Sequence, residues 1–239
     1  MMKKLLFLLA FLMLFSCDKI PENLLSGKVT EAENAAGLKE ALNVGAKFAL
    51  NKLGAQDGFF RDEAVKILLP EDAANLVRAA QNIPVINTLV NKAAEDFIFA
   101  MNRAAEASIT EVIPVVAKAI TDMSIQDAGN ILFSSDHLAA THYLHSKTYT
   151  PLCGICQSVI EDVLDRNIVG QSTLKAWETL TGFCNQVPGI NIETNLAEYA
   201  TRKTLDGVFL KVGGEEEKIR TDVNARVTDL LRRVFGQLN

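Results

Sequence analysis

The chain has 239 residues with a formal net charge of −5 at pH 7, and 49% of its residues are apolar. An acidic protein gains no electrostatic attraction to a polyanion, so this charge argues against nucleic acid as a partner. The length suits one domain, and the apolar fraction is ample for a packed core.

Residues 1–16 have the organisation of a bacterial signal peptide. Two lysines precede the unbroken apolar stretch 5–15, and the small Ser16 stands directly before Cys17. The apolar stretch is too short to span a bilayer as a permanent helix. Residues 14–17 resemble the lipobox, in which the cysteine thiol is acylated and the cysteine becomes the new amino terminus. The alternative is an ordinary cleaved signal followed by a chance cysteine.

Lipidation would make Cys17 a membrane anchor, because each acyl methylene buried in a bilayer adds about 0.8 kcal/mol. We therefore expect an exported lipoprotein that is attached to a bacterial membrane and faces the periplasm. Asp18 resembles the signal that retains enteric lipoproteins in the inner membrane, but other phyla do not follow that rule. Attachment to the inner membrane and attachment to the outer membrane both remain alternatives. Residues 17–33 are predicted to be the lipidated cysteine and a solvated linker.

The first predicted helix covers residues 37–54, where apolar residues recur every three or four positions and a glycine stands at the C-cap position. The next stretch contains a turn signal at Asp57-Gly58 and a run, 65–69, that is predicted to be extended, before a proline. At most one short β-hairpin, near residues 58–70, is expected there.

A long helical segment is predicted after Pro84, and Pro114 should force that helix to kink or restart. Ser124, with an aspartate three residues on, resembles a capping box variant for a short helix that ends near residue 133. Ser135 is expected to cap another helix.

Four more helices are expected: 152–164, 171–184, one that begins at Asn195, and a closing helix over 223–235. The first of them follows Thr150-Pro151, where a capping hydroxyl precedes a proline at the first helical position. About eight helices and at most one hairpin predict an all-α fold, a single-domain multi-helix bundle over residues 34–239.

Several short motifs, in a fixed order, together resemble one known family. They are residues 37–42, 57–59, 69–71, 101–106, 203–207 and 215–220, followed by 230–231 and 234–236. They are similar to the bacterial family called domain of unknown function 4197 over nearly the whole mature chain. The resemblance implies an exported, largely helical protein, often a lipoprotein, with no assigned activity. The cysteines and the histidine cluster depart from the family pattern, so chemistry built on them would be peculiar to this chain.

Asn102, Arg103 and Glu106 form a polar trio on an alanine-rich helix. Spacings of three and four residues place Glu106 beside both of the others on one helix face. One hypothesis is that the trio lines a ligand-binding cleft. The other is that Arg103 and Glu106 form an intrahelical ion pair or tie the helix to a neighbour, an interaction of less than about 1 kcal/mol if exposed.

The histidines and two of the cysteines suggest a metal site. His142 and His145 share a helical face and, together with Cys153 and Cys156, supply the four ligands of a zinc site. This hypothesis requires a helix break near Thr148 that returns the cysteines to the histidines. The alternative is that the histidines are solvated surface residues.

Cys153 and Cys156 also have the spacing of a redox dithiol, and a thiol in the first turn of a helix becomes more acidic. The surrounding pattern lacks the alternating strands and helices of a thioredoxin scaffold, and Cys184 makes the number of candidate thiols odd. A structural disulfide between Cys184 and either Cys153 or Cys156 is therefore favoured. The acidic run 215–217 is interpreted as a solvated charge run.

These observations favour a non-enzymatic, membrane-anchored module of the cell envelope that binds an envelope protein or a small ligand through the cleft at the polar trio. The alternative is a metal- or thiol-dependent envelope enzyme that uses the histidine and cysteine cluster, and a purely structural spacer is a third hypothesis. The sequence contains no phosphate-binding glycine loop, nucleophile elbow or zinc-protease helix. It does not identify a cofactor.

Overall fold

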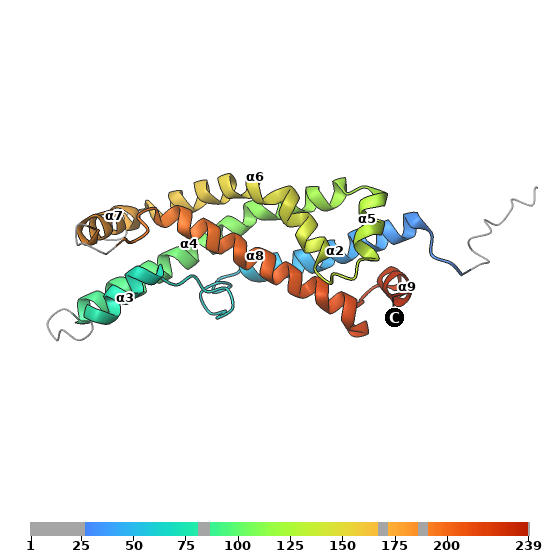
Figure 1. The fold of residues 1–239 in the computed structure, drawn as a ribbon, viewed down its shortest axis with the longest axis horizontal. Coiled ribbons are helices and arrows are strands. Elements are labelled where there is room, and N and C mark those ends of the chain that lie inside the picture. The colour runs from blue at the N-terminus through green and yellow to red at the C-terminus, as the bar shows by residue number, and fades with distance from the viewer. Residues whose placement is uncertain (1–26, 81–86, 167–171, 186–190, 239) are drawn as a thin grey trace, which may run out of the picture.

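The computed structural model describes residues 27–80, 87–166, 172–185 and 191–238, which form an elongated bundle of helices (Figure 1). These described residues contain eight α-helices and a short 3-10 turn, and no β-strand occurs among them. The predicted all-α, single-domain class is therefore confirmed. None of the described helices is long and apolar enough to cross a membrane. The predicted signal peptide and Cys17 lie outside the described residues.

Four long helices form the body of the molecule. Their bounds are Glu31–Gly54 for α2, Asn87–Asp122 for α4, Ala139–Leu164 for α6 and Leu196–Thr221 for α8. α2 packs against α4 and α8, and α6 packs against the same two helices, so the four enclose one apolar core. The stripe that predicted the first helix lies in this core, each residue at most 4% exposed: Leu38, Leu42, Ala46, Ala49 and Leu53.

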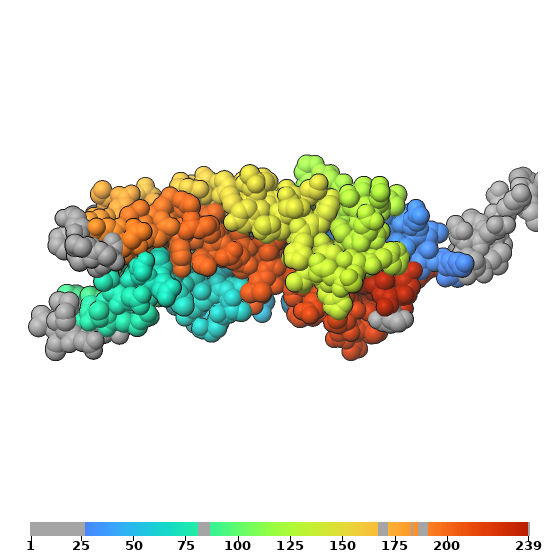
Figure 2. All heavy atoms as spheres, viewed as in Figure 1, coloured from blue at the N-terminus to red at the C-terminus, as the bar shows by residue number. Residues whose placement is uncertain are grey.

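Four short helices lie toward the two ends of this body (Figure 1). Their bounds are Glu71–Ala80 for α3, Ile125–Leu132 for α5, Thr173–Cys184 for α7 and Asp229–Gly236 for α9. α5 and α9 pack against α2, near the end where α2 begins. At the opposite end, α3 packs against α4, and α7 packs against α6 and α8. The space-filling view shows the same elongated shape, with α3 and α7 at one end (Figure 2).

The first helix begins at Glu31, earlier than the predicted start at residue 37. Thr30 and Glu33 form a capping box: Thr30 Oγ1 accepts from the Glu33 N–H at 3.2 Å, and Glu33 Oε2 accepts from the Thr30 N–H at 2.9 Å. These bonds satisfy amides that the first turn of a helix leaves unpaired. Residues 31–33, which the sequence analysis assigned to the linker, therefore belong to this helix.

Two prolines that were predicted to interrupt or start helices lie inside them. α4 continues through Pro114, and α6 continues through Pro151, so the predicted break near Thr148 is absent. A proline removes one helical hydrogen bond, the one to the carbonyl four residues earlier. Those carbonyls belong to Thr110 and Lys147, which are exposed, so water can satisfy them.

The predicted N-caps Ser124 and Asn195 are confirmed. Each side-chain oxygen accepts a hydrogen bond of 3.0 Å from the backbone N–H three residues on. Ser135 does not cap the next helix, which begins at Ala139. The closing helix is shorter than predicted and begins at Asp229, after a 3-10 turn.

Candidate functional site

Asn102 of α4 is one of the three residues predicted to line a cleft. It is fully buried where α4 faces the loop that follows α2. Its Nδ2 donates to the Ile67 carbonyl at 2.8 Å and to the Ile98 carbonyl at 2.7 Å. Its Oδ1 accepts from the Ile67 N–H at 2.9 Å. No hairpin forms near residues 58–70, and the Asn102 amide pairs with both backbone groups of Ile67 as a neighbouring strand would.

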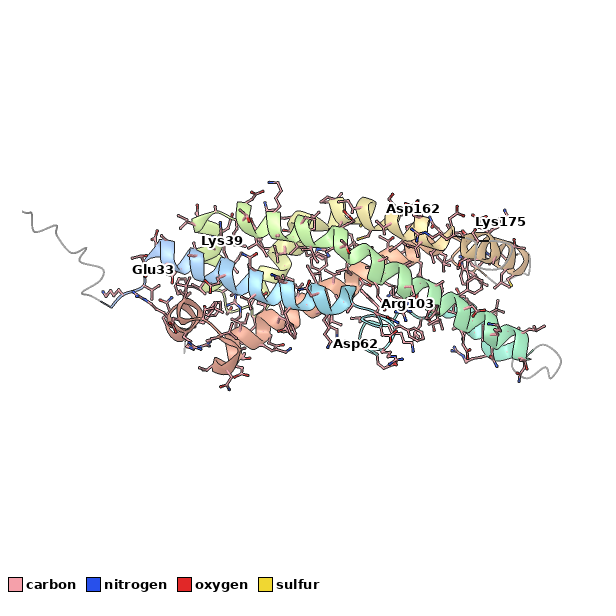
Figure 3. The ribbon with its side chains drawn as sticks, turned by 180° about the vertical axis from the view of Figure 1, so that it is seen from behind. Glu33, Lys39, Asp62, Arg103, Asp162 and Lys175 are labelled. Carbon is pink, nitrogen blue, oxygen red and sulfur yellow. The ribbon has the colours of Figure 1, made fainter. Side chains whose placement is uncertain are left out.

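Glu106 ties the same loop to α4 one turn farther along. Its Oε1 accepts from the backbone N–H groups of Phe59 and Phe60 at 3.1 and 3.2 Å. Its Oε2 accepts from Arg103 at 2.5 Å, and Arg103 also pairs with Asp57 of the loop. Figure 3 shows Arg103 where α4 passes this loop. The structure therefore brings the predicted trio together, and each member bonds to the loop or to another member.

The loop is fastened to α8 on its other side. Lys211 donates to Asp62 at 2.7 Å, and this hydrogen bond holds the pKa of the Asp62 carboxyl below its usual range. All buried side-chain nitrogen and oxygen atoms of the described residues have hydrogen-bond partners. A shallow hollow borders Arg103 and Glu106, but the chain itself occupies their polar groups. Ligand binding by the trio stays a prediction.

A second buried acid, Glu216 of α8, was interpreted from the sequence as part of a solvated charge run, and this interpretation was wrong. Its carboxylate accepts from the backbone N–H groups of Ala140 and Thr141 at 3.0 and 2.8 Å. These amides belong to the first turn of α6, and the N-cap residue Leu138 makes no side-chain cap. Glu216 therefore caps α6 from a different helix.

Arg220 joins a third helix to this carboxylate. Its Nε donates to Glu216 at 3.0 Å, and its Nη atoms donate to the carbonyls of Leu132 and Ile131 at 3.1 and 2.9 Å. Those carbonyls end α5, so one ion pair caps the start of α6 and the end of α5. Both side chains of the pair are only 4% exposed.

The residues predicted to form a zinc site are not brought together. His142 and His145 lie near the start of α6, and Cys153 and Cys156 lie farther along the same helix. Because a helix rises about 1.5 Å per residue, His142 and Cys153 are roughly 16 Å apart along its axis. The zinc hypothesis depended on a break near Thr148, and α6 has none. In the described part of the chain, no three His, Cys, Asp or Glu side chains are placed to hold a metal ion.

The same side chains have separate environments. His142 and His145 are exposed on α6, which was the alternative interpretation. Cys156 is fully buried in the core, and burial raises the pKa of its thiol to about 11. Cys153, Cys156 and Cys184 are free thiols, so the predicted disulfide is not formed.

A cavity of about 280 Å³ opens between α3, α4 and α7, at the end of the molecule opposite to the start of α2. Each of the three helices lines it with four residues at positions i, i+3, i+4 and i+7, which share one helix face. These residues are Ala73, Leu76, Val77 and Ala80 of α3; Val90, Ala93, Ala94 and Phe97 of α4; and Trp177, Leu180, Thr181 and Cys184 of α7. Leu69 and Ile192 complete the wall.

The wall of this cavity is apolar. Trp177 Nε1 donates to the Glu193 carbonyl at 2.9 Å, and Thr181 Oγ1 donates to the Trp177 carbonyl at 2.9 Å, so neither donor points at an unfilled space. The Trp177 and Phe97 rings pack edge to face, with centroids 5.1 Å apart. The wall therefore offers hydrocarbon and aromatic surface, together with the Cys184 thiol.

Sequence reasoning missed α3, and with it the cavity. The signals were present, because Glu71 and Asp72 place two acids in the first turn, directly after Pro70. Residues 73–80 then carry their apolar positions at helical spacing. The predicted helix over 171–184 corresponds to α7, which supplies the facing wall.

Comparison with known proteins identifies a family and no activity. The model of the family described as Protein of unknown function (DUF4197) matches residues 28–236, nearly the whole chain. No curated protein and no solved structure matches the chain. The match spans all of the described α-helices, so the cavity and both buried glutamates lie within the region that the family shares.

Proposed function

Because the chain belongs to the DUF4197 family of proteins of unknown function, its role must be inferred from its own residues, and we propose that it is a non-enzymatic binding module of the bacterial cell envelope. In this proposal, lipid on Cys17 holds the mature chain at a membrane after export. The arrangement of residues 1–17 supports the anchor, because charge, apolar length and a small residue before the cysteine all agree.

The shape of the bundle supports a binding role at its free end. α2 begins at one end of the elongated molecule, and α3 and α7 lie at the other (Figure 1). An anchor that precedes α2 attaches the molecule to the membrane by the end at which α2 begins. The cavity between α3, α4 and α7 is then at the end that is free to meet a ligand.

The observation that carries the proposal is the apolar wall of the cavity. Such a wall favours binding, because burying apolar surface contributes roughly 25 cal/mol per Å². Acid–base catalysis needs a positioned proton donor or acceptor at the reacting group. The buried acids Glu106 and Glu216 instead accept hydrogen bonds from the chain's own backbone, away from this cavity.

The anchor is tested by labelling cells with radioactive palmitate and recovering the protein from the membrane fraction. We expect label in the full chain and none in the Cys17→Ser variant. Cys153→Ser is the matched control, because it removes another thiol and should keep the label. A wild-type chain without label, or a labelled Cys17→Ser chain, would overturn the anchor.

A further inference from the structure

We propose that the cavity between α3, α4 and α7 binds one hydrocarbon chain of an amphiphile, tail first, with the polar end left in water. The inference rests on the proposed binding function and names the class of ligand. The shape of the cavity, the gradient of exposure along it and the placement of charge around it support this assignment.

The shape follows from the three lining stripes. Each stripe runs from position i to i+7, so each covers about 10 Å of helix at a rise of about 1.5 Å per residue. Half of the residues with which α3 and α4 line the cavity are alanines, including Ala73 and Ala94, and these leave the space that larger side chains would fill. A volume of about 280 Å³ lies just below the range of roughly 300–1,000 Å³ that is usual for drug-sized ligands. It therefore suits one slender chain better than a whole lipid.

The exposure of the wall sets the direction in which the hydrocarbon chain enters the cavity. Phe97 and Trp177, toward the body of the bundle, are buried, with exposed fractions of 8% and 1%. Ala80, the last residue of α3, and Val90, in the first turn of α4, are only partly buried, and Leu180 is 44% exposed. A hydrocarbon tail gains most where water is excluded, so its methyl end should lie beside Trp177.

The charges near the cavity exclude a buried head group. Several charged residues of these helices form pairs outside the cavity wall, such as Lys92 with Asp96 and Lys175 with Glu178. No charged side chain lines the cavity among the described residues. Burying a carboxylate or phosphate without a partner is strongly unfavourable, so the head group must stay in water.

Trp177 is the only tryptophan of the chain, so its fluorescence reports on the cavity. The experiment uses the full mature chain, residues 17–239, with Cys17→Ser to keep it free of lipid. The probes are dodecanoate brominated next to the methyl end and dodecanoate brominated next to the carboxylate. We expect saturable quenching by the first probe and several-fold weaker quenching by the second. Equal quenching by both, or quenching that does not saturate, would overturn tail-first binding.

Variants that fill the cavity test the location of the site. Ala94→Leu should weaken binding of the methyl-brominated probe by about tenfold or more, because an extra branched side chain takes the place of the ligand. Ala117→Leu, on an exposed face of the same helix, is the control and should bind normally. Ala73→Leu repeats the test from α3, in case Ala94→Leu fails to fold. Unchanged binding in the folded cavity variants would overturn the site.

The outcomes separate this inference from the proposed function. Palmitate on Cys17 without saturable quenching of Trp177 would leave the anchor intact and remove the hydrocarbon site. Saturable, position-dependent quenching without palmitate on Cys17 would leave the site intact and remove the anchor. Displacement of the probe by naphthalene as readily as by dodecanoate would identify a site for compact aromatic molecules and overturn the assignment to a chain.

Discussion

The start of α6 and the region between α3, α4 and α7 differ in how their helices are joined. At the start of α6, Glu216 and Arg220 of α8 satisfy backbone groups of α6 and α5, so buried charge and unpaired helix ends compensate one another. Between α3, α4 and α7, apolar faces meet without filling the space and leave about 280 Å³. Polar groups satisfied within the chain therefore close a region, whereas incompletely filled apolar faces leave it able to accept a ligand.

The short helices of the two ends show the same difference. α9 has eight residues and buries three of them, Leu231, Val234 and Phe235. α3 has ten residues and buries only Ala73. Elements with little buried apolar surface are the ones that open or shift at low cost. α3 is therefore the helix that we expect to adjust when the cavity is occupied.

The largest expected effect is at the ion pair. Glu216→Gln should lower the free energy of unfolding by about 3–5 kcal/mol, because Arg220 would stay buried without a compensating charge. Urea denaturation measures this change. Glu217→Gln, at the exposed neighbouring position, should change the stability by less than about 0.5 kcal/mol. Similar losses in both variants would show that the buried network does not hold the helices.

A smaller effect of opposite sign is expected at the cavity. Ala94→Leu should raise the free energy of unfolding by about 0.5–2 kcal/mol, because it fills empty apolar volume. The measurement is the same urea denaturation, with Ala117→Leu as the control that adds the same side chain on an exposed face. A clear loss of stability in Ala94→Leu alone would contradict an empty space of about 280 Å³ between the helices.

Local signals predicted much of the fold. The apolar stripe of α2 and the N-caps Ser124 and Asn195 depend on residues within one or two turns, and the structure confirms them. The cap of α6 could not be predicted, because Glu216 is 76 positions from Ala140 in the chain. Breaks were predicted where prolines stand, since the sequence does not show that the freed carbonyls belong to exposed residues.

In the candidate sites too, features set by local sequence were predicted, and features that join distant residues were not. Asn102, Arg103 and Glu106 were predicted to lie together because their spacing is local, but their bonds to the loop join residues 35 to 47 positions apart. The zinc hypothesis failed because it needed a chain reversal that α6 does not make. The cavity depends on three helix faces meeting, which periodicity in one segment cannot reveal.

Protection of Cys184 from alkylation by iodoacetamide tests hydrocarbon binding at the free end most directly, again with the mature Cys17→Ser chain. Cys184 lines the cavity. Cys156 is buried, and because burial raises the pKa of its thiol to about 11, Cys156 should react slowly and serves as an internal reference. Dodecanoate at about ten times its Kd should slow the alkylation of Cys184 roughly tenfold. Cys153, outside the cavity, should react at an unchanged rate. Equal rates for Cys184 with and without dodecanoate would contradict a hydrocarbon site between α3, α4 and α7.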